Sequence, residues 1–549
     1  MGRVENPLST TPDPPGAGSP PRTRVFRNAP PLLWIAALLV AAISLSPLLY
    51  LIVRTSQLGG TLFEILSQRK IWTVFVQTGL LTIVVTFTAV ILGVVLAWIT
   101  VRTDLPSRSL ITIIVSLPLV LPSYISAFSL IVVLGPRGLL QGFLEGFGVE
   151  RLPSIYGFPG AWLALTLFTY PFVFLSVRAG LAGLDPSLED AARCLGRGPW
   201  NTFRHVILPQ LKPSIHAGAL LSALYTLSDF GAVTLLQFDS FTRAIYVQYT
   251  ASLDRSVAAV LALMLALLTL VILAVEFRRP ARRRYYRSSA GTARRATRVA
   301  LGKWKIPAVI LCVAVAVVGI GLPVLAIAVW LVRGVVYGDE HLGVHATVML
   351  DSIFASSTGA LLTVVAAFPV VFLAARYPGR RTQGVERAAY VGHALPGIVV
   401  ALALVFFSAR YTVGLYQSFA LLMIAYQVRF LPLAIGALRS SMLQINPRLE
   451  EAARSLGHTP REVFVSIILP LARPGVLTAV ALVFLSCMKE LPATLLLGPT
   501  GFETLAMRIW NATEEAFFAR AAIPSLLLVC VSAIGLSVVL SNEEKGASP

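Results

Sequence analysis

The chain alternates between long apolar runs and short polar segments. A bilayer core takes about 20 residues of α-helix, and backbone N–H and C=O groups cannot stay unpaired in lipid, so apolar runs of that length predict spanning helices. We therefore expect an all-α, polytopic membrane protein with about 12 transmembrane helices in two six-helix halves. The twelve runs begin near Leu32, Thr73, Leu110, Gly157, Ser214, Ala258, Ile306, Ile353, Ala388, Gly414, Gly475 and Ile523.

One polar segment between apolar runs occurs twice. Residues 189–209 read EDAARCLGRGPWNTFRHVILP and residues 450–470 read EEAARSLGHTPREVFVSIILP, with 11 of 21 positions identical. Two copies at equivalent places predict two homologous halves. The expected order is a tail that its prolines and glycines keep disordered (1–30), a first transmembrane domain (31–276), a basic linker (277–305), a second transmembrane domain (306–541) and a C-terminal tail (542–549).

Composition and charge support a membrane protein and orient it. Charged residues make up 13% of the chain, against about 25% in ordinary soluble domains. The net charge of +19 would suit a nucleic-acid-binding protein, but 30 of the 45 Lys and Arg residues fall in the two tails and in the loops of one side. This is the positive-inside bias, so we expect both termini and the repeated segment in the cytoplasm, membrane lipid as a partner, and no nucleic acid. For the basic linker, an anionic-lipid contact is an open alternative to a solvated topology signal, which we favour.

Each copy of the repeated segment carries helix start and stop signals. A proline and acidic residues precede an Ala-Ala pair, and a glycine follows it. A second helical stretch is expected after the next proline, ending before the proline that precedes the following span. The prediction is a helix-turn-helix outside the membrane, marked by Pro186, Gly196, Pro199 and Pro209 in the first copy and by Pro447, Gly457, Pro460 and Pro470 in the second.

The first helix of each copy has the composition of a docking surface. Adjacent alanines permit close backbone approach to another protein, and the flanking charges can fix its orientation. A plain connector between spans is the alternative, but it gives no reason for 11 identities between halves whose spans have diverged. We therefore favour docking, with these residues as the candidates: Glu189, Asp190, Ala191, Ala192, Gly196, Pro209, Glu450, Glu451, Ala452, Ala453, Gly457 and Pro470.

These residues resemble the E-A-A loop of binding-protein-dependent ABC importer permeases. The second copy has the acid in its usual form, Glu451, whereas the first copy departs mildly, with Asp190 for Glu and Val206 for Ile. The resemblance implies the type I importer permease fold, in which each loop forms a coupling helix that sits in a cleft of a cytoplasmic ATPase. It also implies two copies of that ATPase and a soluble binding protein as partners.

Two further stretches narrow the resemblance. Residues 117–130 (LPLVLPSYISAFSL) and 393–407 (HALPGIVVALALVFF) are similar to the third spans of fused ferric-ion permeases, in which one chain supplies both transmembrane domains. This implies import of ferric iron from the periplasm to the cytoplasm across a bacterial inner membrane, after delivery by a periplasmic ferric-binding protein. An importer permease for thiamine, phosphonate or polyamine is the alternative.

No nucleotide site is expected in the chain itself. A Walker A loop needs GxxxxGK[ST], whereas Gly302-Lys303 is followed here by Trp304. We expect no catalytic residue and no cofactor on this chain, with ATP and Mg²⁺ on the partner ATPase subunits. An ion-coupled secondary transporter is the rival class. The loop VRTDLPSRS, however, lacks the G-x-x-x-D-R pattern common in the largest such family.

Two acids lie inside predicted spans at equivalent places of the two halves, Asp229 and Glu490. Ionisable groups in spans are costly and are functional candidates by default, so both are candidates to line the translocation pathway. The alternative is that each caps a helix break, beside Gly231 or Pro492, or that Glu490 pairs with Lys489.

One polar loop has the spacing of metal ligands. GDEHLGVHATVML places two histidines four residues apart beside two carboxylates. A solvated turn is the favoured interpretation, so we expect no metal site at Asp339, Glu340, His341 and His345.

Overall fold

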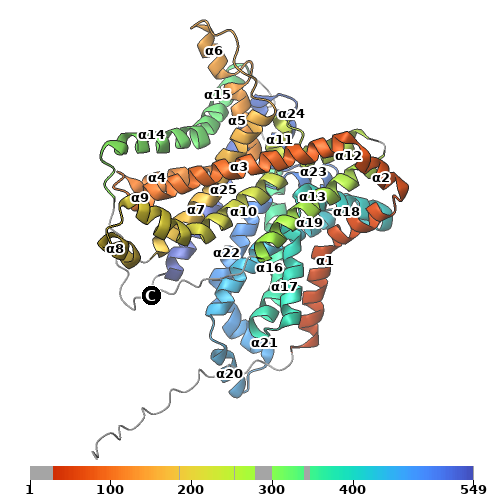
Figure 1. Cartoon of the computed structure of the whole chain (residues 1–549). Coiled ribbons are helices and arrows are strands. Elements are labelled where there is room, and N and C mark those ends of the chain that lie inside the picture. The colour runs from red at the N-terminus through yellow and green to blue at the C-terminus, as the bar shows by residue number, and fades with distance from the viewer. Residues whose placement is uncertain (1–28, 185, 253, 279–298, 339–345, 548–549) are drawn as a thin grey trace, which may run out of the picture.

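The computed structural model describes residues 29–184, 186–252, 254–278, 299–338 and 346–547 (Figure 1). In these ranges, every regular element is a helix apart from one isolated bridge between Thr103 and Val299. Among the described residues, ten helices are long and apolar enough to span a membrane, and a pair bent by 95°, Arg380–Gly392 with Gly397–Tyr411, makes an eleventh if it counts as one span. The all-α polytopic prediction is confirmed; with the bent pair counted, the structure has one span fewer than the twelve expected.

The span expected near Ser214 accounts for the difference. It lies in α10 (Leu208–Ser228), which has the length of a span. Gln210, Lys212 and His216 in its first half make it less apolar than the ten helices.

The first half contains α1 (Pro31–Ser56), α2 (Gly60–Ser67), α3 (Arg69–Arg102), α4 (Arg108–Ser116), α5 (Ser123–Leu134), α6 (Leu139–Glu145), α7 (Phe158–Gly183), α8 (Pro186–Cys194), α9 (Pro199–Thr202), α10, α11 (Gly231–Leu235), α12 (Phe241–Ala251) and α13 (Ser256–Arg278). The second half contains α14 (Lys305–Ala316), α15 (Leu322–Val336), α16 (Ala346–Arg376), α17 (Arg380–Ala394), α18 (Gly397–Tyr411), α19 (Phe419–Gln444), α20 (Pro447–Ser455), α21 (Pro460–Val463), α22 (Leu469–Met488), α23 (Pro492–Leu497), α24 (Leu505–Glu514) and α25 (Phe518–Ala547). Because α25 runs to Ala547, the expected C-terminal tail continues this helix.

A three-helix unit forms the centre of each half. In the first half α3, α7 and α10 pack on one another, and in the second half α16, α19 and α22 do the same. Small residues allow the close approach that packing in lipid requires. A Cβ atom on Gly218 of α10, for example, would lie 2.6 Å from the Cα of Val173 on α7.

The two halves are interleaved at their first helices. Helix α1 packs against α16 and α17 of the second half (Figure 1). In the other direction, α14 contacts α4 and α15 contacts α5 of the first half. Helices at the start of each half thus pack against the other half, which ties the two repeats together.

Candidate functional site

The repeated segment forms a short helix that ends at a left-handed glycine. Helices α8 and α20 each start at the expected proline, with Glu189 or Glu450 in the first turn. Gly196 has φ +81° and Gly457 has φ +91°, a region that other residues adopt only with strain. In Figure 1, α20 lies at the lower edge of the molecule and α8 at its left side, whereas α6 projects from the top.

The second helical stretch does not end before Pro209 and Pro470, contrary to the prediction. Short π-helical segments, Phe203–Ile207 and Phe464–Ile468, carry the chain from α9 into α10 and from α21 into α22. A proline inside an α-helix clashes with the carbonyl four residues earlier, and the wider π turn relieves that clash. Helices α8 and α20 are called the docking helices below, after the role predicted for them. Each is followed, after its glycine turn, by a continuous helix that runs into the membrane.

A buried ion pair holds each short helix against the end of a spanning helix. Arg102, the last residue of α3, lies 2.7 Å from the Glu189 carboxylate, and Arg376, the last residue of α16, lies 2.6 Å from Glu450. The four side chains are almost fully buried. The first acid of each docking helix thus points inward, and its partner arginine is a residue that the sequence analysis did not single out.

The remaining residues of the two short helices divide into an inward and an outward face. Asp190, Ala191, Glu451 and Ala452 are exposed, whereas Ala192 and Ala453 are buried. The sequence analysis missed two leucines at the helix ends. Leu195 is 82% exposed and Leu456 is 81% exposed, and exposure at both equivalent positions makes this pair the main apolar feature of the outward faces.

The two span acids sit at helix breaks. The Asp229 carboxylate accepts the backbone N–H groups of Ala232 and Val233 at the start of α11. The Glu490 carboxylate accepts the N–H of Ala493 at the start of α23, and it also forms an ion pair of 2.6 Å with Arg429. Helix capping, the alternative interpretation, is therefore present at both breaks, but Glu490 pairs with Arg429 and not with Lys489.

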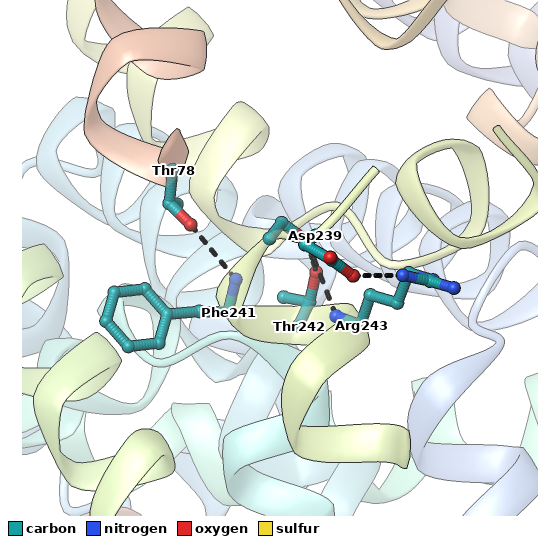
Figure 2. Close-up of polar contacts among 6 residues, drawn as sticks. Thr78, Asp239, Phe241, Thr242 and Arg243 are labelled. Carbon is teal, nitrogen blue, oxygen red and sulfur yellow. Dashed lines mark hydrogen bonds and ion pairs between the residues drawn. The ribbon is translucent and has the colours of Figure 1, made fainter. Parts of the chain in front are cut away.

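The segment after each break is anchored to the preceding spans. Thr242 donates its hydroxyl hydrogen to the Asp229 carbonyl. The Phe241 N–H donates to the hydroxyl of Thr78 on α3 (Figure 2). Figure 2 also shows the ion pair of Arg243 with Asp239 at the exposed side of this turn. The second half repeats the anchor, with the Leu505 N–H donating to Ser352 on α16 over 2.7 Å.

Aromatic side chains join the halves next to these breaks. Phe230, which follows Asp229, lies 5.0 Å from the ring of Trp510 on α24, and both side chains are fully buried. Tyr246 on α12 lies 6.4 Å from Trp510. The Lys489 ammonium donates to the Leu119 carbonyl of the other half over 3.2 Å. The contact between the halves next to Asp229 is thus filled by ring packing.

The described residues hold no group of three or more His, Cys, Asp or Glu side chains placed to bind a metal ion. The four candidates of the GDEHLGVHATVML loop, Asp339, Glu340, His341 and His345, fall outside the described residues. In the second docking segment, the Thr459 N–H donates to the Glu462 carboxylate. This hydrogen bond lowers the pKa of Glu462 and fixes the turn between α20 and α21.

Comparison with known protein families gives a match in each half of the chain. The family model described as "Binding-protein-dependent transport system inner membrane component" matches residues 89–284 and 359–542. The two matches contain both docking segments and both span acids, and they leave out α1, α14 and α15, the helices by which the halves are interleaved.

Three relatives illustrate the range of this family. The "Fe(3+)-transport system permease protein FbpB 2" of Haemophilus influenzae is 35% identical over 92% of this chain and 97% of its own length. A "Probable ABC transporter permease protein" of Sinorhizobium fredii is 26% identical over 87% of this chain and 89% of its own. The molybdenum transport system permease protein of Escherichia coli K12 is 35% identical over 26% of this chain and 60% of its own. The chain therefore belongs to the family of inner membrane components of binding-protein-dependent transport systems, with the family domain present twice.

Proposed function

We propose that this chain is the transmembrane permease of an ATP-driven importer of ferric iron, with both transmembrane domains in one chain. The observation that carries the proposal is the pair of equivalent docking helices, each tied by a buried Arg–Glu ion pair to the end of a spanning helix. One ATPase copy docks at α8 and a second at α20. The similarity to a ferric iron permease over nearly the whole length of both chains supports iron as the cargo.

The geometry supplies a mechanical route from the docking helices to the path. Glu189 and Glu450 connect α8 and α20 to α3 and α16, so a movement of either docking helix is passed to a spanning helix. The continuous helices after each loop lead to Asp229 and Glu490. Closure of the ATPase pair on ATP draws α8 and α20 together and separates the ring contact of Phe230 with Trp510. Hydrolysis resets the closed path.

The orientation follows from the charge distribution. The docking helices and both termini lie in the cytoplasm of a bacterial cell, since 30 of the 45 basic residues lie on that side. A periplasmic ferric-binding protein delivers the cargo to the opposite face. ATP and Mg²⁺ bind the partner ATPase subunits, because the chain's Gly302-Lys303 pair lacks the rest of a Walker A loop. Asp229 and Glu490 line the pathway beside the ring seal.

Partner capture tests the cargo and the class together. The tagged chain is purified from its native membrane, partners are identified by mass spectrometry, and metal is measured on any co-purified binding protein. An ATPase with a ferric-loaded partner is the expected result. An ATPase with an iron-free partner that carries an organic ligand would overturn iron and keep the importer, and capture of no ATPase would favour an ion-coupled secondary transporter.

A substitution at the glycine turns tests coupling. Valine at Gly196 and Gly457 should abolish iron uptake and substrate-stimulated ATP hydrolysis, because valine is strained by about 1–3 kcal/mol at positive φ and shifts the docking helix. Gly198→Val is the matched control, since Gly198 also has open space around its Cβ position but no positive φ. Unchanged uptake and unchanged stimulated hydrolysis in the Gly196→Val/Gly457→Val variant would rule out coupling through these loops.

A further inference from the structure

The arginines that hold the two docking helices differ in their surroundings. The Arg376 guanidinium donates to Glu450 and also to the carbonyl oxygens of Met442 and Ile445. The equivalent Arg102 has its ion pair with Glu189, and beyond it none of its three buried nitrogens finds a hydrogen-bond partner in the described part of the chain. A guanidinium carries five N–H donors, and buried donors without acceptors are costly. The first half thus leaves donors available where the second half satisfies them.

Arg102 lines a cavity of about 860 Å³ at the side of the docking helix. The cavity wall is formed by one face of α3 and by α9 and α10, and its lining is mostly apolar. Arg102 and Arg193 supply positive charge to the lining, and Glu189, the partner of Arg102, supplies one negative charge. A site with a cationic end and a long apolar wall matches an amphiphile with an anionic head.

The cavity is open to the hydrophobic surface of the protein and is bordered by tryptophans. Ile91 and Val95 on its α3 wall are exposed on a helix that spans the membrane. At the other border Trp200 is 72% exposed and Trp304 is 73% exposed. Indole rings favour the boundary between lipid tails and water, so these rings mark the depth of lipid head groups.

The end of the interdomain linker closes one side of this cavity. The Val299 N–H donates to the Arg102 carbonyl, and the Leu301 N–H donates to the Asp104 carboxylate. With the nearby Lys305 ammonium, the second bond lowers the pKa of Asp104. Trp304 is held against the cavity by this attachment. The site therefore joins α3, the first docking helix and the linker.

The second half has a larger side chain at the position equivalent to the cavity wall. Thr78 and Ser352 make equivalent hydrogen bonds in the two halves, and Arg102 and Arg376 are separated by the same number of residues as this pair. By the same separation, Phe368 is the residue equivalent to Val94 of the cavity wall. The Phe368 ring packs 5.1 Å from Phe464. A phenyl ring in one half thus occupies the place that valine leaves open in the other.

We propose that this cavity binds one anionic phospholipid from the leaflet on the docking side, with its phosphate at Arg102 and Arg193 and an acyl chain along α3. Lipid phosphate supplies the acceptors that Arg102 lacks, and basic pockets between spanning helices on the cytoplasmic side are suited to such head groups. The bound lipid fastens the first docking helix to α3 as Met442 and Ile445 help to fasten the second.

Val94→Phe tests the proposal, because it copies the packing of the second half. The wild-type chain and the variant are reconstituted with phosphatidylglycerol or phosphatidylcholine, re-extracted in mild detergent, and the retained lipid is counted by native mass spectrometry. We expect about one retained phosphatidylglycerol on the wild-type chain and at least a fivefold loss in the variant. Val365→Phe is the control, since Val365 is an exposed residue of α16 outside the cavity, and it should retain lipid as the wild type does.

Three results would overturn the proposal. Equal retention by the wild type and Val94→Phe would place the lipid elsewhere. Equal retention of phosphatidylcholine would remove the role of the head-group charge, and displacement of the lipid by millimolar inorganic phosphate would make the site one for free phosphate. All of these experiments measure retained lipid and none measures iron uptake. The lipid proposal can therefore be tested even if the proposed function is wrong.

Discussion

Replacing Glu450 by alanine should detach the second docking helix and destabilise the chain by about 3–5 kcal/mol, because it leaves the Arg376 guanidinium buried without a counter-charge. Both side chains of this pair are almost fully buried, so water cannot take the place of the carboxylate. Thermal unfolding of the purified chain in lipid nanodiscs measures the loss. ATPase binding should weaken in the same variant, since α20 no longer has its inward anchor.

The neighbouring acid provides the control. Glu451→Ala removes the same side chain from an exposed position and should change stability by less than about 0.5 kcal/mol. A double variant, Arg376→Met/Glu450→Leu, removes both charges together and should recover most of the stability lost in Glu450→Ala. Equal effects of Glu450→Ala and Glu451→Ala would show that the ion pair does not anchor the helix.

Local signals in the sequence were enough to predict where the short helix of each repeated loop starts and ends. Proline and acids at the start and glycine at the end predicted α8 and α20, and the glycines have the positive φ that such ends require. The error at Pro209 and Pro470 came from the same kind of signal. A proline is usually a helix boundary, and the π turns that carry the helix past it depend on packing that has no sequence mark.

The residues that the sequence analysis missed are defined by contacts between distant segments. Arg102 and Arg376 stand at the ends of spans, where a basic residue is fully explained as a topology signal, and their acidic partners follow 74 or more residues later. The spacing along the chain gave no hint, because Arg102 precedes Glu189 by 87 residues whereas Arg376 precedes Glu450 by 74. The contact of Phe230 with Trp510 had no hint either, because it depends on how the two halves face each other.

The packing of helices from one half against the other half is even harder to predict from sequence patterns. Apolar helices such as α1 carry little information about which neighbour they pack against, because lipid and protein offer similar apolar surroundings. The repeat predicts two equivalent units but not the contacts that α1, α14 and α15 make with the opposite half. The cavity beside Arg102 is a product of divergence between the repeats, visible only when both halves are compared in three dimensions.

A second large effect is expected when the exposed leucines of the docking helices are changed to aspartate. Leu195 and Leu456 are more than four-fifths exposed at equivalent positions, and leucine at such places is stabilised by burial in a partner. Full burial of a leucine contributes about 1.5–3 kcal/mol, and a carboxylate in its place adds a desolvation cost. Leu195→Asp/Leu456→Asp should therefore weaken ATPase binding by at least about 100-fold, measured by surface plasmon resonance on nanodiscs.

The control separates docking from a general effect of added charge. Val413→Asp puts a carboxylate at another exposed apolar position, in the turn between α18 and α19, one helix length away from α20. It should bind the ATPase as the wild type does. Wild-type binding by the double leucine variant, with its unfolding temperature unchanged, would mean that the outward faces of α8 and α20 are not the docking surface. The single variants Leu195→Asp and Leu456→Asp compare the two halves. Loss of binding in only one of them would mean that the two halves contribute unequally to the ATPase contact. We expect such a difference, because Arg102 and Arg376 hold their docking helices through different numbers of hydrogen bonds.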